Sequence, residues 1–228
     1  IVGALLYISI CTRPDISFTV MHLSRFLTRY SSEHYEAAIR CLKYLVNTKT
    51  RSLWLRNSPY DAIVQVYADA DLGNEFSLKS ISGYCILVNG NLISWGSKIQ
   101  PTIAQSTLEA EYVALNLGTK EGLYVAHMLH DALNFGEIMQ SDKKDTCEIP
   151  MEVYCDNARL VDSIKSGSIK GAKSVRHLRL KVGWLREQLL NDTVVFNHVA
   201  GVSNQADLFT KPLKTLLLEK FGKQLNIV

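Results

Sequence analysis

Four acidic residues stand next to apolar segments, where burying a carboxylate without a neutralising partner is unfavourable in free energy. They are Asp69 in VYADAD, Glu111 in LEAEYVAL, Asp156 in VYCDN and Asp207 in NQADLFTKP. Each ends an apolar run or lies beside one on a predicted helix, where burying an unpaired carboxylate costs several kcal/mol. If the fold brings these acids together, they need a cation, and a hard divalent ion suits oxygen ligands best. The sequence therefore suggests a divalent-metal site.

Each acid also has a purely structural explanation when it is taken alone. Asp69 follows the strand pattern VQVYA, where an acid is equally typical of a turn. Asp71 would share its face of the strand because side chains alternate, so spacing alone leaves these two residues tied. Asp156 precedes a predicted helix and suits an N-cap, and Asp207 suits a first helical turn, where acids favour the helix dipole. The order and context of the four acids along the chain indicate a functional site more specifically than any one of them does alone.

Glu111 lies on a predicted helix whose apolar face should cover a sheet. Leu108 and Leu115 stand at i−3 and i+4 from it, which places its carboxylate in the buried stripe or at its margin. Glu109 points in a different direction and is expected to be solvated. A surface acid beside the stripe remains the alternative for Glu111.

The apolar periodicity predicts a helical first part, residues 1–50, with Pro14 at a helix entry and Ser31-Ser32 as a cap. Short strands are then predicted over 52–56, 63–69, 83–88, 92–95, 151–155 and 193–199, and Asn89-Gly90 favours a tight hairpin. Helices are predicted over 106–133, 157–165, 175–190 and 204–211, the last ended by Pro212, and 135–149 is predicted to be a loop. This order implies a mixed sheet covered by helices.

Composition limits the class of protein. The chain has 228 residues, 47% apolar and 21% charged, enough to bury the core of one large domain or two small ones. Five cysteines without a C-x-x-C pair argue against zinc and a disulfide framework, and favour a reducing intracellular compartment. The apolar opening IVGALLYISI is too short to cross a membrane. Because the chain starts without Met, we expect it to be a piece of a longer protein.

A basic segment without any acid extends from Lys165 to Arg186. The buried stripe of its predicted helix consists of Leu178, Val182, Leu185 and Leu189, so most basic groups should project outward. Such groups bind phosphates without reading sequence. A solvated basic face is the alternative. The residues expected to contact nucleic acid are Lys165, Lys170, Lys173, Arg176, His177, Arg179 and Lys181, with Arg186 as a further basic group.

Several longer motifs resemble a known family: VYADAD, KSISGYCIL, ISWGSKIQPTIAQSTLEAEYVAL, VYCDNARLVDSI, VRHLRLKVGWLRE and ADLFTKPL. In this order they resemble the ribonuclease H domain of Ty1/copia-type retrotransposon reverse transcriptases. The preceding VGALLYISICTRPDISFTVMHLSRF and HYEAAIRCLKYLVNTK are similar to the end of the polymerase region in those polyproteins. The resemblance covers about residues 2–213.

The resemblance implies an α/β fold of the RNase H-like, retroviral-integrase-like type: a mixed five-stranded sheet flanked by helices and preceded by a small helical segment. The boundaries it implies are a helical tail of the polymerase region over 1–57, a ribonuclease H domain over 58–213 and a C-terminal extension over 214–228. Matched residue by residue, the catalytic and metal-binding acids are Asp69, Glu111, Asp156 and Asp207. The implied cofactor is two Mg²⁺ ions, with Mn²⁺ as a substitute.

The implied activity is a metal-dependent endonuclease that cleaves the RNA strand of RNA–DNA hybrids during reverse transcription, leaving 3′-hydroxyl and 5′-phosphate ends. The expected partners are the hybrid and the remainder of the reverse transcriptase polypeptide, with no membrane. The expected location is cytoplasmic, in virus-like particles, with the nucleus as the alternative. The oligomeric state is not set by the sequence.

Some positions depart from the family pattern. Leu72 replaces a Trp, and Val202 stands where related enzymes carry a mobile histidine; His198 precedes that position and does not inherit the role. No YxDD polymerase motif occurs, so DNA synthesis is not expected of this piece. The alternative functions are a catalytically silent clamp or dimerisation domain within a larger reverse transcriptase, and an integrase-like strand transferase.

Overall fold

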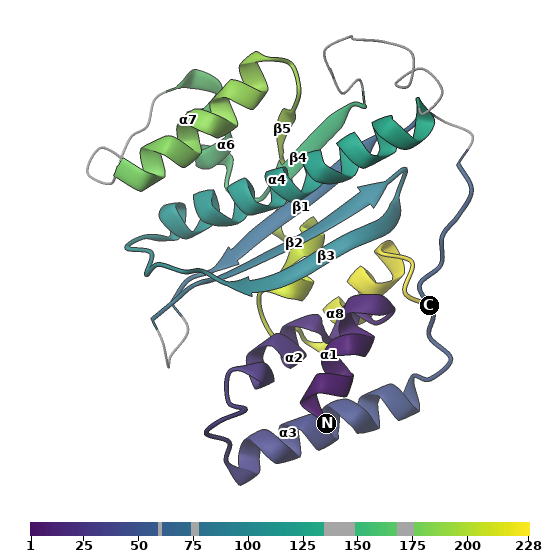
Figure 1. The fold of residues 1–228 in the computed structure, drawn as a ribbon. Coiled ribbons are helices and arrows are strands. Elements are labelled where there is room, and N and C mark those ends of the chain that lie inside the picture. Colours follow the sequence, from purple (N-terminus) through teal and green to yellow (C-terminus); the bar gives the residue numbers. More distant parts are fainter. Residues whose placement is uncertain (59–60, 74–77, 135–148, 168–175) are drawn as a thin grey trace.

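A mixed five-stranded sheet forms the centre of the computed structural model, which describes residues 1–58, 61–73, 78–134, 149–167 and 176–228 (Figure 1). The strand order is β3-β2-β1-β4-β5. The strands are β1 (Val64–Asp71), β2 (Ile81–Val88), β3 (Asn91–Ile99), β4 (Met151–Cys155) and β5 (Val195–His198). β1, β2 and β3 are antiparallel neighbours, whereas β4 runs parallel to β1 and β5 parallel to β4. The predicted mixed sheet is therefore confirmed.

The hairpin between β2 and β3 turns at the predicted dipeptide. Asn89 and Gly90 both have positive φ angles, 50° and 75°. A two-residue turn with this geometry follows the natural twist of the strands, and Asn-Gly adopts it at low cost. The hairpin fixes the antiparallel half of the sheet, in which β2 lies beside β1.

Three helices cover one face of the sheet: α4 (Thr107–Leu133), α6 (Ala158–Ser166) and α7 (Arg176–Leu190) (Figure 1). The main apolar core lies between these helices and the strands, with Val66, Leu115, Leu185 and Phe196 fully buried. The predicted stripe of α7 is confirmed, because Leu178, Val182 and Leu185 are buried and Leu189 packs against the same core.

The opposite face is covered by short 3₁₀ helices and by both ends of the chain (Figure 1). η2 (Gly201–Ser203) and η3 (Gln205–Phe209) replace the predicted short α-helix, and α8 (Thr215–Gln224) follows them. Phe209, Leu225 and Ile227 form a second core with Cys85 and Leu87 of β2. The C-terminal residues thus contribute to the packing of the sheet.

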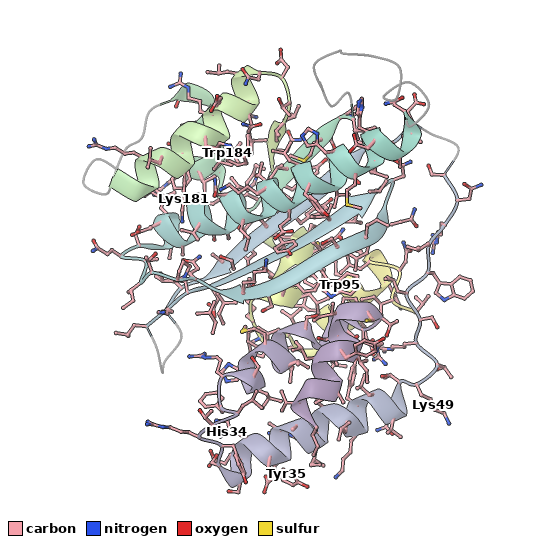
Figure 2. The ribbon with its side chains drawn as sticks, in the orientation of Figure 1. His34, Tyr35, Lys49, Trp95, Lys181 and Trp184 are labelled. Atoms are coloured by element: carbon pink, nitrogen blue, oxygen red, sulfur yellow. The ribbon has the colours of Figure 1, made fainter. Side chains whose placement is uncertain are left out.

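The N-terminal part is helical, as predicted. It consists of α1 (Val2–Cys11), η1 (Pro14–Ile16), α2 (Ser17–Ser24) and α3 (Ser32–Asn47), which enclose a third core that contains Leu5 and Val20. Ser31 caps α3, and the His34 side chain accepts a hydrogen bond from the Ser31 backbone N–H (3.0 Å). Trp95 of β3 joins this part to the sheet by donating its indole N–H to the Ser9 carbonyl (2.9 Å; Figure 2).

The strand predicted over 52–56 is not formed. Leu53 forms an isolated bridge with Ile227, and the backbone of its neighbours Ser52 and Trp54 hydrogen-bonds Val228 and Asn226. The Trp54 and Leu55 side chains are exposed. This segment therefore pairs with the end of the chain and does not join the five-stranded sheet.

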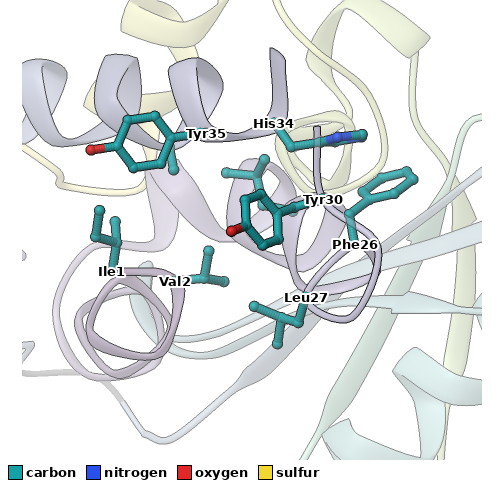
Figure 3. A pocket seen from close by; sticks show the side chains of 9 residues that line it. Ile1, Val2, Phe26, Leu27, Tyr30, His34 and Tyr35 are labelled. Atoms are coloured by element: carbon teal, nitrogen blue, oxygen red, sulfur yellow. The ribbon is translucent and has the colours of Figure 1, made fainter. Parts of the chain in front are cut away.

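A cavity of about 270 Å³ opens between the N-terminal helices (Figure 3). Its walls are apolar and aromatic, with Phe26, Tyr30, Tyr35 and His34 among them. None of the acids singled out above lines it. Among the described residues, no helix combines the length and the apolar character that a membrane crossing requires.

Candidate active site

Two neighbouring parallel strands bring the first pair of acids together. Tyr67 of β1 is in register with Tyr154 of β4, and two residues later come the acids, Asp69 on β1 and Asp156 directly after the end of β4. Because the strands run parallel, their carboxyl ends meet at the same edge of the sheet, the usual place for a site in such a sheet. The register therefore explains why these two carboxylates lie side by side.

The four predicted acids converge in two overlapping groups. Carboxylate oxygens of Asp69, Asp156 and Asp207 lie within 4.8 Å of one another, and Glu111 and Asp156 approach within the same limit, together with the Cys155 sulfur. Asp156 belongs to both groups. Asp69 and Asp207 are buried, and Glu111 and Asp156 are partly buried.

Asp207 is placed by the contact of η3 with β1 and β2. Asn204 is fully buried, donates its amide N–H to the Ala68 carbonyl (3.0 Å) and accepts from the Ala206 backbone N–H (3.2 Å). Gly83, which faces Asp69 across the β1–β2 pair, leaves room for η3, because a Cβ there would lie 2.6 Å from the Thr210 methyl group. Thr210 in turn donates its hydroxyl to Asp69.

Burial and mutual repulsion perturb three of the acids. Burial, followed by the charges of Asp69 and Asp156, raises the pKa of Glu111 to about 9. Burial and then Asp69 raise the pKa of Asp207 to about 6, and the same two causes raise the pKa of Asp156. Since crowded carboxylates disfavour one another's charge, the protein alone does not fully neutralise this cluster.

Lys211 is part of the site, although the sequence argument did not single it out. Its Nζ lies 2.9 Å from Asp207 Oδ1 and 3.7 Å from Asp69 Oδ2. Burial lowers the pKa of Lys211, but the hydrogen bond and charge of Asp207 and the charge of Asp69 outweigh this effect and raise it. Its spacing of four residues from Asp207 was the available signal, because residues i and i+4 are neighbours on a helical turn.

The donor set fits a hard divalent cation. The four acids offer carboxylate oxygens, which are the ligands that Mg²⁺ and Ca²⁺ prefer. The nearby Cys155 is an unsuitable ligand, because burial strongly raises the pKa of its thiol and only a thiolate binds metals well. A divalent ion would also offset the repulsion that raises the carboxyl pKa values.

Asp71 and Glu109 are outside the two groups of acids that converge. Asp71 has a pKa raised first by burial, and its position at the end of β1 leaves Asp69 as the strand acid nearest to Asp156 and Asp207. The expectation that Glu109 is solvated is wrong. It is buried, and its Oε2 accepts the backbone N–H of Gln105 (2.8 Å), the residue just before the N-cap Ser106 of α4.

The basic residues divide into three kinds. Lys165 and Arg179 are exposed, and Lys181 is half-buried on the part of α7 next to α4 (Figure 2). Arg186 does not project freely, because its guanidinium lies against Gly167, where an added Cβ would be 1.7 Å from Nη1. Lys170 and Lys173 lie outside the described residues, as do the side chains of Arg176 and His177.

Comparisons with known proteins identify relatives by sequence. The retrovirus-related Pol polyprotein from transposon TNT 1-94 of Nicotiana tabacum is 34% identical over 212 residues, which are 92% of this chain and 15% of that polyprotein. The Pol polyprotein from transposon RE1 of Arabidopsis thaliana is 27% identical over 228 residues, 100% of this chain and 14% of that polyprotein. Secreted RxLR effector protein 161 of Plasmopara viticola is 39% identical over 125 residues, 54% of this chain and 87% of that protein. No family model matches the chain.

Among solved structures, RNase H1 from Halobacterium salinarum aligns with 64% of this chain and 93% of its own, at 19% identity and a TM-score of 0.42. This structural similarity is too low to support any assignment beyond the one that the sequence relatives give. The chain spans about 15% of the length of the TNT 1-94 polyprotein. By its sequence it belongs to the retrovirus-related Pol polyproteins of Ty1/copia-type retrotransposons.

Proposed function

We propose that the chain is a metal-dependent endonuclease that cleaves the RNA strand of RNA–DNA hybrids during reverse transcription. The observation that carries this proposal is the convergence of Asp69, Asp156 and Asp207 within 4.8 Å, with Glu111 beside Asp156. A clamp that only binds nucleic acid has no need for clustered carboxylates whose pKa values are raised by burial and then by mutual repulsion.

The four acids are proposed to hold two Mg²⁺ ions, for which Mn²⁺ can substitute. When bound, such ions lower the pKa of water and stabilise the leaving 3′ oxygen of a phosphodiester. Asp156 is shared between the two groups of acids, so it is the residue best placed to contact both ions. Thr210 orients Asp69 through its hydrogen bond, and Lys211 balances part of the charge of Asp69 and Asp207.

The hybrid is proposed to contact the basic residues of α6, α7 and the segment between them. Lys165 and Arg179 offer exposed cations, and Lys170, Lys173, Arg176 and His177 are included from the sequence. Lys181 is also included among the residues proposed to contact the hybrid, although it is half-buried on the part of α7 next to α4. Contacts of this kind bind phosphates, so selection for a hybrid would depend on groove shape and on 2′-hydroxyls.

The remainder of a longer Pol polypeptide is the proposed partner in the cell, since the Pol relatives extend far beyond the matched residues. We place the activity in cytoplasmic virus-like particles, where reverse transcription of such elements would occur.

The test is to incubate the purified chain with Mg²⁺ and three labelled duplexes: RNA–DNA, RNA–RNA and DNA–DNA. We expect cleavage of the RNA strand in the hybrid only, with 3′-hydroxyl and 5′-phosphate ends. Asp156→Asn should reduce the rate about a thousandfold, equivalent to about 4 kcal/mol of transition-state stabilisation. The matched control is Asp71→Asn, which removes a carboxylate from the same site edge and should stay within a few-fold of wild type. Hybrid binding without any cleavage would instead favour the silent clamp, and equal rates for both variants would contradict the residue assignment.

A further inference from the structure

A short segment, residues 198–203, runs alongside Asp156 at the end of the last strand of the sheet. β5 ends with His198, which is in register with Cys155, the last residue of the parallel strand β4. The next residue, Val199, continues this pairing by donating its backbone N–H to the Cys155 carbonyl (3.0 Å). Since Asp156 directly follows Cys155, the pairing places the start of the segment beside the acid that the two converging groups share.

The His198 side chain contacts Asp156 directly. Its Nε2 lies 3.2 Å from the backbone carbonyl oxygen of Asp156. A carbonyl oxygen only accepts hydrogen bonds, so Nε2 carries the hydrogen. The neutral ring with its hydrogen on Nε2 and the protonated ring both donate here, so the contact does not depend on the charge of His198. His198 is in neither group of converging acids, and it therefore bonds the main chain of a proposed metal ligand without being a ligand itself.

The same segment lies close to the Asp156 carboxylate. A Cβ added to Gly201 would be 3.2 Å from Asp156 Oδ2, so close that one of the two groups would have to shift. Glycine allows the backbone to pass at this distance because it has no side chain. The segment is thus next to Asp156 at two points, with His198 at its main chain and Gly201 at its side chain.

Contacts with other elements hold the segment in place. Lys220 of α8 donates a hydrogen bond to the Val202 carbonyl. Asn204, the residue that follows the segment, is fully buried and donates to the Ala68 carbonyl of β1 (3.0 Å). The segment is therefore fastened at its middle and at its end, so the position of His198 against Asp156 is built into the fold.

We propose that His198 is a positioning residue for the metal site, because its hydrogen bond fixes the main chain of Asp156 and so orients the shared carboxylate. The inference rests on the proposed function, since it assumes that the acid cluster holds divalent ions. The role differs from that of the mobile histidine in related enzymes, whose matching position here is Val202. Groups that orient a metal ligand without binding the ion contribute about ten- to a hundredfold to metal affinity.

The experiment measures the Kd for Mn²⁺ by isothermal titration calorimetry at one fixed pH. His198→Asn, whose shorter side chain does not reach the Asp156 carbonyl, should weaken binding about tenfold, and His198→Leu should show the same loss. His198→Gln places an amide donor near the position of Nε2 and should restore most of the affinity. The matched control is His127→Asn, which changes an exposed histidine of α4 outside both groups of acids and should bind like the wild type.

Melting temperatures in EDTA separate positioning from a general loss of stability. His198→Asn should melt no more than about 4 °C below the wild type, the shift that one hydrogen bond produces in a protein of this size. Wild-type affinity in His198→Asn and His198→Leu would overturn this inference and leave the metal site itself intact. Equal losses in the Asn and Gln variants would also overturn it, because the donor would then not be the cause. A wild type that binds no Mn²⁺ would instead refute the proposed function, and this inference with it.

Discussion

Glu111 shows how strongly the surroundings of the site act on a single side chain. Its carboxylate projects from α4 towards three other acids, and burial and their charges raise its pKa to about 9. A carboxyl group in this state favours the neutral form near neutral pH unless a cation is present. The same physical arrangement therefore destabilises the protein at high pH and prepares it for a metal ion.

The pKa shift of Glu111 predicts a pH dependence of stability. Because its folded-state pKa is raised above the unfolded value, its contribution is complete below about pH 4.5 and is lost as the pH rises through about 9. In EDTA the melting temperature of the wild type should therefore fall between these pH values, and Glu111→Gln should flatten the fall. We expect a difference of at least about 2–4 °C, the shift that about 1 kcal/mol produces in a protein of this size.

Added Mg²⁺ should reduce the decline in the wild type, because an ion that binds only the folded state stabilises it. Glu36→Gln, on the exposed side of α3, is the matched control and should follow the wild-type curve. An equally steep decline in Glu111→Gln would show that Glu111 is not the perturbed group.

At the scale of elements, the site depends on how closely α4 approaches the sheet. Gly118 and Gly122 face β1, and a Cβ on Gly122 would lie 2.4 Å from a Val66 methyl group and 2.9 Å from the Met151 sulfur. Val66 has little freedom to rotate away, because branched side chains are restricted at χ1. These glycines let α4 lie against β1 and carry Glu111 to the strand ends.

We predict that Gly122→Ala destabilises the protein by about 1–3 kcal/mol, the usual cost of overpacking a core. Gly183→Ala in α7 is the matched control, since no atom lies within 4 Å of its added Cβ and alanine favours a helix. It should stabilise the protein by up to about 1 kcal/mol. Urea unfolding of both variants measures the difference, and a Gly122→Ala variant as stable as Gly183→Ala would contradict this account of the helix–sheet contact.

Local patterns predicted the elements that depend on local chemistry. The Asn89-Gly90 turn and the Ser31 cap of α3 follow from the backbone preferences of those residues, and both are confirmed. The strand predicted over 52–56 failed because its backbone pairs with residues 226–228, at the other end of the chain, and not with the sheet. Glu109 was misjudged because a backbone N–H four residues earlier satisfies its carboxylate.

The candidate site also divides into residues that local motifs predict and residues that only distant contacts reveal. Its four acids could be named in advance because each stands in a motif that resembles a family. Lys211 and Thr210 could not be assigned, because their contacts with Asp69 depend on how η3 packs against β1 and β2. Spacing alone left Asp69 and Asp71 tied, and the resemblance to the family decided for Asp69.

At the scale of the whole molecule, the helical first part and the sheet are linked through contacts such as the hydrogen bond from Trp95 to Ser9. The C-terminal residues pack with β2 and β3 through Leu225 and Ile227. Boundaries at 57 and 213 remain a prediction. Among the described residues, β1, α4, the end of β4 and η3 each contribute one acid to the cluster.

The central claim is that separate elements of this chain jointly hold divalent ions, and a Mn²⁺ titration followed by electron paramagnetic resonance tests it without relying on activity. Free Mn²⁺ gives the signal, so its loss counts the bound ions. The wild-type chain should bind two Mn²⁺ ions that Mg²⁺ displaces, whereas Asp156→Asn, which removes the carboxylate shared by both groups, should lose at least one of them. If wild type and Asp156→Asn bind the same number of ions with the same affinity, the acid cluster is not the metal site and the account is contradicted.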